Sequence, residues 1–94
     1  DFAFVGATAI SAHPWLMDYT REAAELRAQM LSQARTKIVL ADHTKFDRTA
    51  PVRVPGLDDA DMIITDIQLS ERMHRGFSRL TADIIIAEDE SVED

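Results

Sequence analysis

The chain of 94 residues contains no cysteine, three glycines, three prolines and only 6% aromatic residues. Without cysteine, a disulfide framework and a thiolate zinc site are excluded. No apolar run approaches the roughly 20 residues that a membrane-spanning helix requires, and no secretory signal opens the chain. These absences favour a cytoplasmic protein that does not contact a membrane.

Basic residues are also scarce: the chain has 10 Lys and Arg but 17 Asp and Glu, which gives a formal net charge of −7. Nucleic-acid backbones are bound by clustered Lys and Arg, so these residues are not expected to bind DNA on their own. The acids concentrate in the final stretch EDESVED, residues 88–94, which we interpret as a solvated acidic tail.

The composition that remains, 46% hydrophobic and 29% charged, is typical of one small globular domain. The chain lacks an initiator methionine and enters strand-like sequence directly with DFAFVGATAI. We therefore expect it to be a piece of a longer protein and a partial domain.

Apolar, β-prone runs alternate with segments of helical periodicity along the chain. Buried strands are predicted at residues 2–7, 37–41, 62–65 and 82–87, and a short edge strand at 52–54. Residues 11–18 are predicted to form a loop. The continuous Ile/Val runs suggest strands that are buried on both faces. Together with the alternation of strands and helices along the chain, they predict an α/β fold with a Rossmann-like, mostly parallel sheet flanked by helices.

Two helices are predicted between these strands. The first covers about residues 20–34 and has an apolar stripe of Ala23, Leu26, Met30, Leu31 and Ala34, with Thr20 or Asp18 as its cap. The second follows Ser70 as a cap, and its stripe is Leu69, Met73, Phe77 and Leu80.

Polar residues follow the predicted strand ends, where open α/β sheets bind their ligands. The second strand leads into Asp42, His43, Thr44 and Lys45 within KIVLADHTKFD. The ammonium of Lys45 suits a phosphate or carboxylate, and a solvated surface lysine is the alternative. For Asp42, ligand binding and capping of the turn both stay open.

Several other kinds of site are not expected. His13, His43 and His74 lie in three separate segments without metal-ligand spacing, so no metal site is predicted. The phosphate-binding patterns GxGxxG and GxxxxGK[ST] and the hydrolase pattern GxSxG are absent. Trp15 and Tyr19 are interpreted as partly buried anchors of the first helix, with stacking on a ligand as the alternative.

Four segments in order, FAFVGATAIS, DYTREAAELRAQML, KIVLADHTKFD and DDADMIITD, resemble the effector-sensing domain of DeoR-type transcriptional regulators. The resemblance covers nearly the whole chain, and LADHTKF followed by IITD is its most specific part. It implies that residues 1–87 are the C-terminal portion of a sensor domain similar in fold to ribose-5-phosphate isomerase and glucosamine-6-phosphate deaminase.

The resemblance also implies a function in bacterial transcription regulation, as a repressor of carbohydrate-metabolism genes that binds a phosphorylated sugar. Such a regulator usually forms a homo-oligomer and contacts DNA through an upstream winged helix-turn-helix, which is not in this chain. No cofactor is implied.

Carried over by position, Lys45 would meet the sugar phosphate, Asp42 the sugar hydroxyls, and Gly6 would lie at the first strand end. Thr8 stands where the family has an acid. Glu25 lies near the catalytic helix glutamate of the isomerases, offset along the helix.

A hydroxyl at position 8 cannot move a carbon-bound proton near neutral pH, so we expect a binding domain without catalytic residues. An active isomerase or deaminase relative and a purely architectural oligomerisation module remain alternatives. Asp47 replaces a family glycine, and aspartate tolerates the left-handed turn that such a glycine allows.

Overall fold

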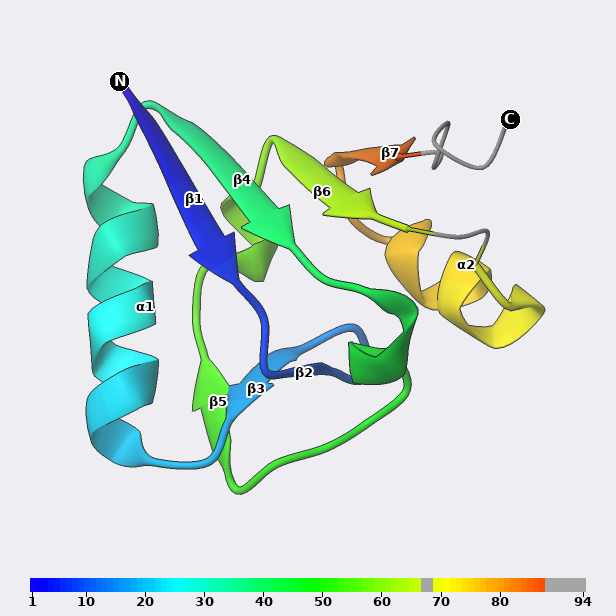
Figure 1. Ribbon diagram of the computed structural model, residues 1–94, viewed down its shortest axis with the longest axis horizontal. Helices are drawn as coiled ribbons and strands as arrows, with labels where there is room; N and C mark the ends of the chain where they lie inside the picture. The colour runs from blue at the N-terminus through cyan, green and yellow to red at the C-terminus, as the bar shows by residue number, and fades with distance from the viewer. Residues whose placement is uncertain (67–68, 88–94) are drawn as a thin grey trace, which may run out of the picture.

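A four-stranded parallel sheet forms the centre of the protein in the computed structural model, which describes residues 1–66 and 69–87 (Figure 1). Its strands lie in the order β1-β4-β6-β7 and are all parallel. Their bounds are β1 Phe2–Gly6, β4 Thr36–Leu40, β6 Met62–Thr65 and β7 Asp83–Ile86. The predicted α/β class with a parallel sheet is confirmed.

A second, antiparallel sheet of three short strands lies beyond the carboxyl ends of β1 and β4 in Figure 1. It consists of β2 Ala9–Ile10, β3 Leu16–Asp18 and β5 Val52–Val54, in the order β2-β3-β5. The predicted edge strand at 52–54 is confirmed as β5. The prediction of a loop throughout 11–18 is wrong, because all three residues of β3 are buried and pair with β5, and two of them, Leu16 and Met17, also pair with β2.

Within the described part of the chain, two α-helices and two short 3-10 helices connect the strands. The α-helices are α1 Arg21–Gln33 and α2 Glu71–Phe77, and the 3-10 helices are η1 His43–Lys45 and η2 Leu57–Asp59. Helix α1 runs beside β1 and β5 (Figure 1) and packs against both. None of the described helices has the length and apolar character needed to cross a membrane.

Both α-helices begin at the caps that the sequence indicated. The Thr20 hydroxyl accepts a hydrogen bond from the N–H of Ala23 at 3.1 Å, and the Ser70 hydroxyl accepts from Met73 at 3.2 Å. Each cap satisfies one N–H that has no partner within the first helical turn. The stripe predicted for α2 is confirmed, because Met73 and Phe77 are buried and its other two members pack against the core.

The stripe predicted for α1 is largely wrong. Of its members only Leu31 is buried, whereas Leu26 is 59% and Met30 41% exposed. The helix instead turns Ala24 and Arg27 inward. Small alanines allow the helix to approach the sheet closely, and the polar contacts of Arg27 fix its rotation about its own axis.

One face of the parallel sheet is buried and the other is largely open. Val5, Val39 and Ile63 pair across three strands and are 0–2% exposed. On the opposite face Phe4 is 55% and Ile85 43% exposed. The expectation that the strands are buried on both faces is therefore wrong for most of the sheet, because the described helices leave this face uncovered; Ile38 of β4 is the exception, at 4% exposed. The predicted acidic tail, residues 88–94, lies outside the described residues.

Candidate functional site

The carboxyl ends of the parallel strands meet at one edge of the sheet. Just past β1, the N–H of Ala7 donates to the Leu40 carbonyl at 2.8 Å, and past β4 the N–H of Ala41 donates to Ile64 at 3.0 Å. These bonds hold the strand exits side by side. The residues that follow them therefore share one rim, which is where the sequence indicated the site.

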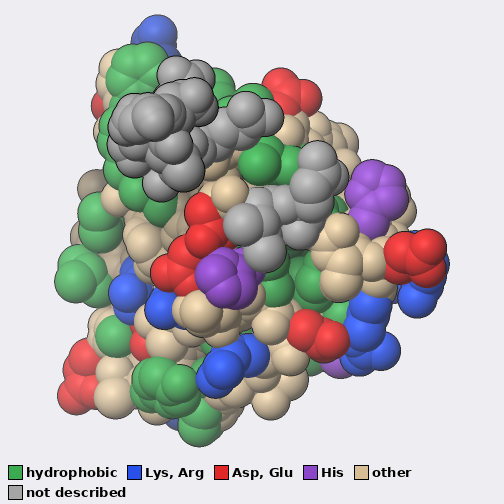
Figure 2. Space-filling view, turned by 45° about the vertical axis from the view of Figure 1, so that its right-hand side comes forward, with side chains coloured by type: hydrophobic (Ala, Val, Ile, Leu, Met, Phe, Trp, Pro, Cys, Tyr) green, Lys and Arg blue, Asp and Glu red, His purple; other side chains and the backbone are tan. Residues whose placement is uncertain are grey.

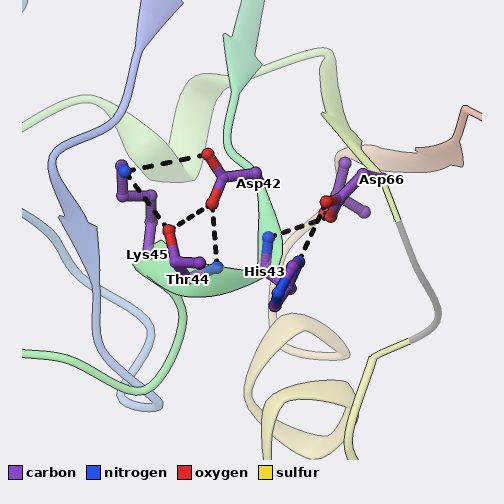
Figure 3. Close-up of polar contacts among 6 residues, drawn as sticks. Asp42, His43, Thr44, Lys45 and Asp66 are labelled. Atoms are coloured by element: carbon purple, nitrogen blue, oxygen red, sulfur yellow. Dashed lines mark hydrogen bonds and ion pairs between the residues drawn. The ribbon is translucent and has the colours of Figure 1, made fainter.

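Asp42 shapes the turn that follows β4. Its Oδ1 accepts hydrogen bonds from the hydroxyl of Thr44 and, at 2.8 Å, from the Thr44 N–H (Figure 3). These bonds, the hydroxyl first, hold the pKa of Asp42 below its ordinary value. Asp42 thus caps η1, which is the structural one of the two roles that the sequence left open.

The ammonium of Lys45 is held at this turn. Its Nζ donates to the Thr44 hydroxyl at 3.3 Å and lies 3.7 Å from Asp42 Oδ2 (Figure 3). The side chain is 38% exposed. Lys45 is therefore partly ordered by the turn but remains open to a ligand from solvent.

His43 binds Asp66 on the other side of the turn (Figure 3). The N–H of His43 donates to Asp66 Oδ1 at 2.9 Å, and its ring Nδ1 lies 2.9 Å from Oδ2. The ring contact is the main reason why the pKa of Asp66 lies below its ordinary value. This pair fastens the exit of β4 to the exit of β6.

A pocket of about 280 Å³ opens beside Lys45. Its two cationic residues, Lys45 and Arg48, come from the turn, and Thr8 and Thr44 contribute hydroxyls. The described residues that line it are Ala7, Thr8, Tyr19, Thr44, Lys45 and Arg48. Since none of these described lining residues is acidic, the pocket suits a negatively charged, hydroxyl-bearing ligand.

Asp47 turns the chain so that Arg48 reaches this pocket. It has a positive φ of 56°, in the left-handed region that aspartate tolerates better than most residues. The N–H of Arg48 then donates to the Ile10 carbonyl at 3.3 Å. The expected left-handed turn at position 47 is confirmed.

Comparison with known families matches residues 1–67 to the DeoR C terminal sensor domain. The chain belongs to the DeoR C-terminal sensor domain family. The resemblance seen in the four sequence segments is therefore confirmed.

Three regulators illustrate this similarity. The "Glycerol-3-phosphate regulon repressor" of Haemophilus influenzae is 34% identical over 69% of this chain and 26% of its own length. The "HTH-type transcriptional repressor GlcR" of Bacillus subtilis is 33% identical over 70% of this chain and 25% of its own length. The "Putative sgc region transcriptional regulator" of Escherichia coli K12 is 29% identical over 82% of this chain and 30% of its own length. The chain thus spans between a quarter and a third of the length of these relatives.

The structure brings together two of the five residues proposed for the DeoR-type sensor site. Lys45 and Thr8 line the pocket, and Asp42 lies beside it as the partner of Lys45. Gly6 ends β1, where its carbonyl accepts a 2.7 Å hydrogen bond from Arg27 Nε. Glu25 is exposed on α1 and is not among the lining residues.

Of the remaining lining residues of the Lys45 pocket, Arg48 was not recognised in the sequence, and Tyr19 was considered for ligand stacking only as an alternative. Tyr19 is 62% exposed, so its interpretation as a partly buried anchor is wrong. Arg48 is placed by the turn at Asp47, and a possible left-handed residue was the only sequence signal for it. Among the described residues, no group of three or more His, Asp or Glu side chains could hold a metal ion.

A partly buried ion pair between Asp18 and Arg27 fixes one wall of the Lys45 pocket. Asp18 is only 4% exposed and pairs through Oδ2 with Arg27, while its Oδ1 accepts from the Tyr19 N–H at 2.7 Å. Because Arg27 also binds the Gly6 carbonyl, the pair ties the end of β1 to the segment that holds Tyr19.

Proposed function

We propose that this chain is the effector-binding part of a transcriptional repressor and that its pocket at the sheet edge binds a phosphorylated sugar or a related anionic metabolite. The observation that supports this most directly is the shared pocket of Lys45, Arg48 and two threonine hydroxyls. The name of the Haemophilus influenzae relative, "Glycerol-3-phosphate regulon repressor", is consistent with an effector that bears a phosphate.

The two cationic side chains suit the phosphate end of such a ligand. In a protein with a net charge of −7, a dianion is repelled by most of the surface, so a local pair of cations decides where it binds. Arg48 offers a planar fork of donors, and Lys45 offers a compact charge. Asp42 is a positioning residue here, since it shapes the turn and lies 3.7 Å from the Lys45 ammonium.

The hydroxyls of Thr8 and Thr44 and the ring of Tyr19 suit the sugar end. The threonines can donate to or accept from sugar hydroxyls, and the exposed tyrosine presents both an apolar face and a phenol. No acidic residue is among the described lining residues, and the Asp42 carboxylate beside the pocket is already engaged by Thr44 and Lys45 rather than placed as the base that sugar isomerisation requires. This favours a binding domain over an isomerase or deaminase.

Binding is proposed to act on a cytoplasmic homo-oligomer whose DNA-binding module, a winged helix-turn-helix, lies outside these 94 residues. A coupling free energy of about 1–3 kcal/mol between effector and operator binding would change operator affinity about 5- to 150-fold. Residues 1–87 would form the C-terminal portion of the sensor, and the acidic residues 88–94 a tail.

The test is operator release by the intact protein in the presence of a panel of sugar phosphates and their unphosphorylated counterparts. Lys45→Gln removes the charge with little change in length. Because hydrogen bonds to charged groups contribute about 1.5–3 kcal/mol, we expect the half-maximal effector concentration to rise about 10- to 150-fold. Operator affinity without effector should stay unchanged.

Arg35→Gln is the matched control, since Arg35 is exposed and lies outside the pocket lining. It removes the same charge and should respond like the wild type. An unaltered effector response in Lys45→Gln would eliminate Lys45 as the phosphate contact. Release by the unphosphorylated sugar at equal concentration would eliminate phosphate as the recognised group.

A further inference from the structure

A second pocket, of about 310 Å³, lies between α2 and the segment that follows β2. It shares no lining residue with the Lys45 pocket. Three of the ten basic residues of the chain line it, and Figure 2 shows Lys and Arg side chains gathered on the right of the view. Its lining, among the residues that the structure describes, is Ala12, His13, Arg72, Arg75, Gly76 and Arg79.

The helical spacing places the three guanidinium groups on one side of α2. Arg72, Arg75 and Arg79 stand at i, i+3 and i+7, the positions that share a helix face. Although α2 ends at Phe77, the N–H of Arg79 donates to the Gly76 carbonyl at 3.1 Å. This turn keeps Arg79 beside the other two arginines.

Gly76 allows the helix to approach the opposite wall of this pocket. A Cβ atom at position 76 would lie 2.5 Å from the Ala12 carbonyl oxygen, which is closer than a side chain tolerates. The backbones of α2 and residue 12 are therefore almost in contact. In this position Arg79 Nη1 donates to the His13 carbonyl at 3.4 Å, which closes the pocket on one side.

The His13 wall is ordered by its own contacts. The imidazole stacks on Trp15, with ring centroids 4.4 Å apart and planes at 18°. The hydroxyl of Ser11, a residue only 3% exposed, lies 3.4 Å from His13 Nδ1. The Arg53 guanidinium lies 4.6 Å from the Trp15 ring centroid, so Trp15 is held as well. A ligand would meet a wall that is already in place.

The positive charge of this pocket is only partly neutralised. Arg72 pairs with Asp47 at 3.0 Å, and Arg75 reaches Glu71 only at 4.0 Å, with 72% of its side chain exposed. Exposed pairs of this kind are weak. Within residues 1–66 and 69–87, Arg79 forms no ion pair with a carboxylate.

From this arrangement we propose that the pocket between His13 and α2 is a second anion site that binds a phosphate group. Guanidinium forks match the oxygens of phosphate in pairs, and three of them converge on one concave surface. The proposal does not rest on the sugar-phosphate function of the Lys45 pocket, because the two linings are separate.

The fluorescence of Trp15 provides the test, since it is the single tryptophan of these 94 residues and stacks on the His13 wall. The intact protein is titrated with orthophosphate and separately with methyl phosphate, with chloride at matched ionic strength as the blank. We expect a saturable change for both phosphates. Equal affinities would identify free phosphate as a sufficient ligand, and tighter binding of the ester would identify a phosphorylated metabolite.

Arg75→Gln/Arg79→Gln should weaken phosphate binding about tenfold or more, because two charged donors are lost. Both side chains lie at the surface, and circular dichroism verifies that the variant is folded. Arg21→Gln/Arg35→Gln, which removes the same net charge from exposed positions, should bind as the wild type does. Lys45→Gln/Arg48→Gln should also retain the Trp15 signal.

Four results would overturn the proposal. The first is the absence of a saturable change with either phosphate, and the second is an equal change with chloride. The third is retention of wild-type affinity by the Arg75/Arg79 variant. Loss of the signal in the Lys45/Arg48 variant would count in the same way, because it would assign the phosphate to the other pocket.

Discussion

Substitution of Gly76 by alanine should destabilise the protein even though alanine favours helices. The added Cβ would lie 2.5 Å from the oxygen and 3.2 Å from the carbonyl carbon of Ala12, and both atoms are backbone. A flexible side chain could move aside, but here α2 or the segment around residue 12 must shift. Overpacking of this kind costs about 1–3 kcal/mol.

Two opposing effects set the net change in the free energy of unfolding of Gly76→Ala. Alanine gains about 1 kcal/mol over glycine in a helix interior. Because the obstacle is rigid backbone, we place the packing cost of Gly76→Ala near the upper end of its range, which leaves a net loss of about 1–2 kcal/mol. For a domain of this size, each kcal/mol lowers Tm by about 4–8 °C, so we expect a fall of roughly 5–15 °C.

The assay is thermal and urea unfolding followed by circular dichroism, with Gly6→Ala as the matched control. A Cβ at Gly6 would meet no heavy atom within 4 Å, so this variant should be as stable as the wild type or slightly more stable. If Gly76→Ala unfolds at or above the wild-type temperature, the close contact between α2 and Ala12 is wrong. The geometry argued for the arginine pocket would then fail with it.

Two further predictions concern polar contacts. Arg27→Ala should lower the free energy of unfolding by about 2 kcal/mol, measured by urea unfolding, because it leaves the buried Asp18 without its ion-pair partner. The loss should be smaller than the 3–5 kcal/mol of a fully buried pair, because Arg27 itself is partly exposed. The hydrogen bonds from Thr44 lower the pKa of Asp42 in the folded protein. The stability that this carboxylate adds should therefore be fully present above its ordinary pKa of 3.8. It should be lost as the pH falls through the lower pKa of the folded state. Thr44→Val should therefore make the loss of stability below pH 3.8 shallower, as measured by urea unfolding at a series of pH values.

Each of these has a direct control. Arg21→Ala removes an exposed arginine from the same helix and should leave the urea midpoint in place. A midpoint for Arg27→Ala equal to that of Arg21→Ala would contradict the role of the buried pair. For the prediction on Asp42, the control is an NMR titration of its carboxyl group in the wild type and in Thr44→Val. The same pKa in both would show that the Thr44 hydrogen bonds are not the cause of the lowered pKa.

The sequence predicted those parts of the fold that depend on local chemistry. The Thr20 and Ser70 caps, the four main strands and the stripe on α2 follow from cap residues and periodicity over several residues. β3 was missed because Leu16–Asp18 lacks the apolar/polar alternation that marked β5, and its burial comes from pairing with β2 and β5. The rotation of α1 was missed because Arg27 faces inward, which hydrophobicity alone does not indicate.

The site was predictable only where it follows a strand directly. Lys45 was found because parallel strands deliver their ends to one edge. Tyr19 and Arg48 reach the same pocket from segments whose course depends on the buried Asp18 pair and on the turn at residue 47. Those are tertiary contacts, and no spacing along the chain encodes them.

The left-handed residue Asp47 has a consequence for how this position can vary. Its backbone requires a positive φ, and its carboxylate holds Arg72, so a single residue meets a conformational and an electrostatic demand. A glycine would keep the turn and release the arginine, whereas an alanine would lose the ion pair and also strain the backbone. Substitution at this position can therefore alter the charge of the arginine pocket while the path of the chain toward Arg48 is preserved.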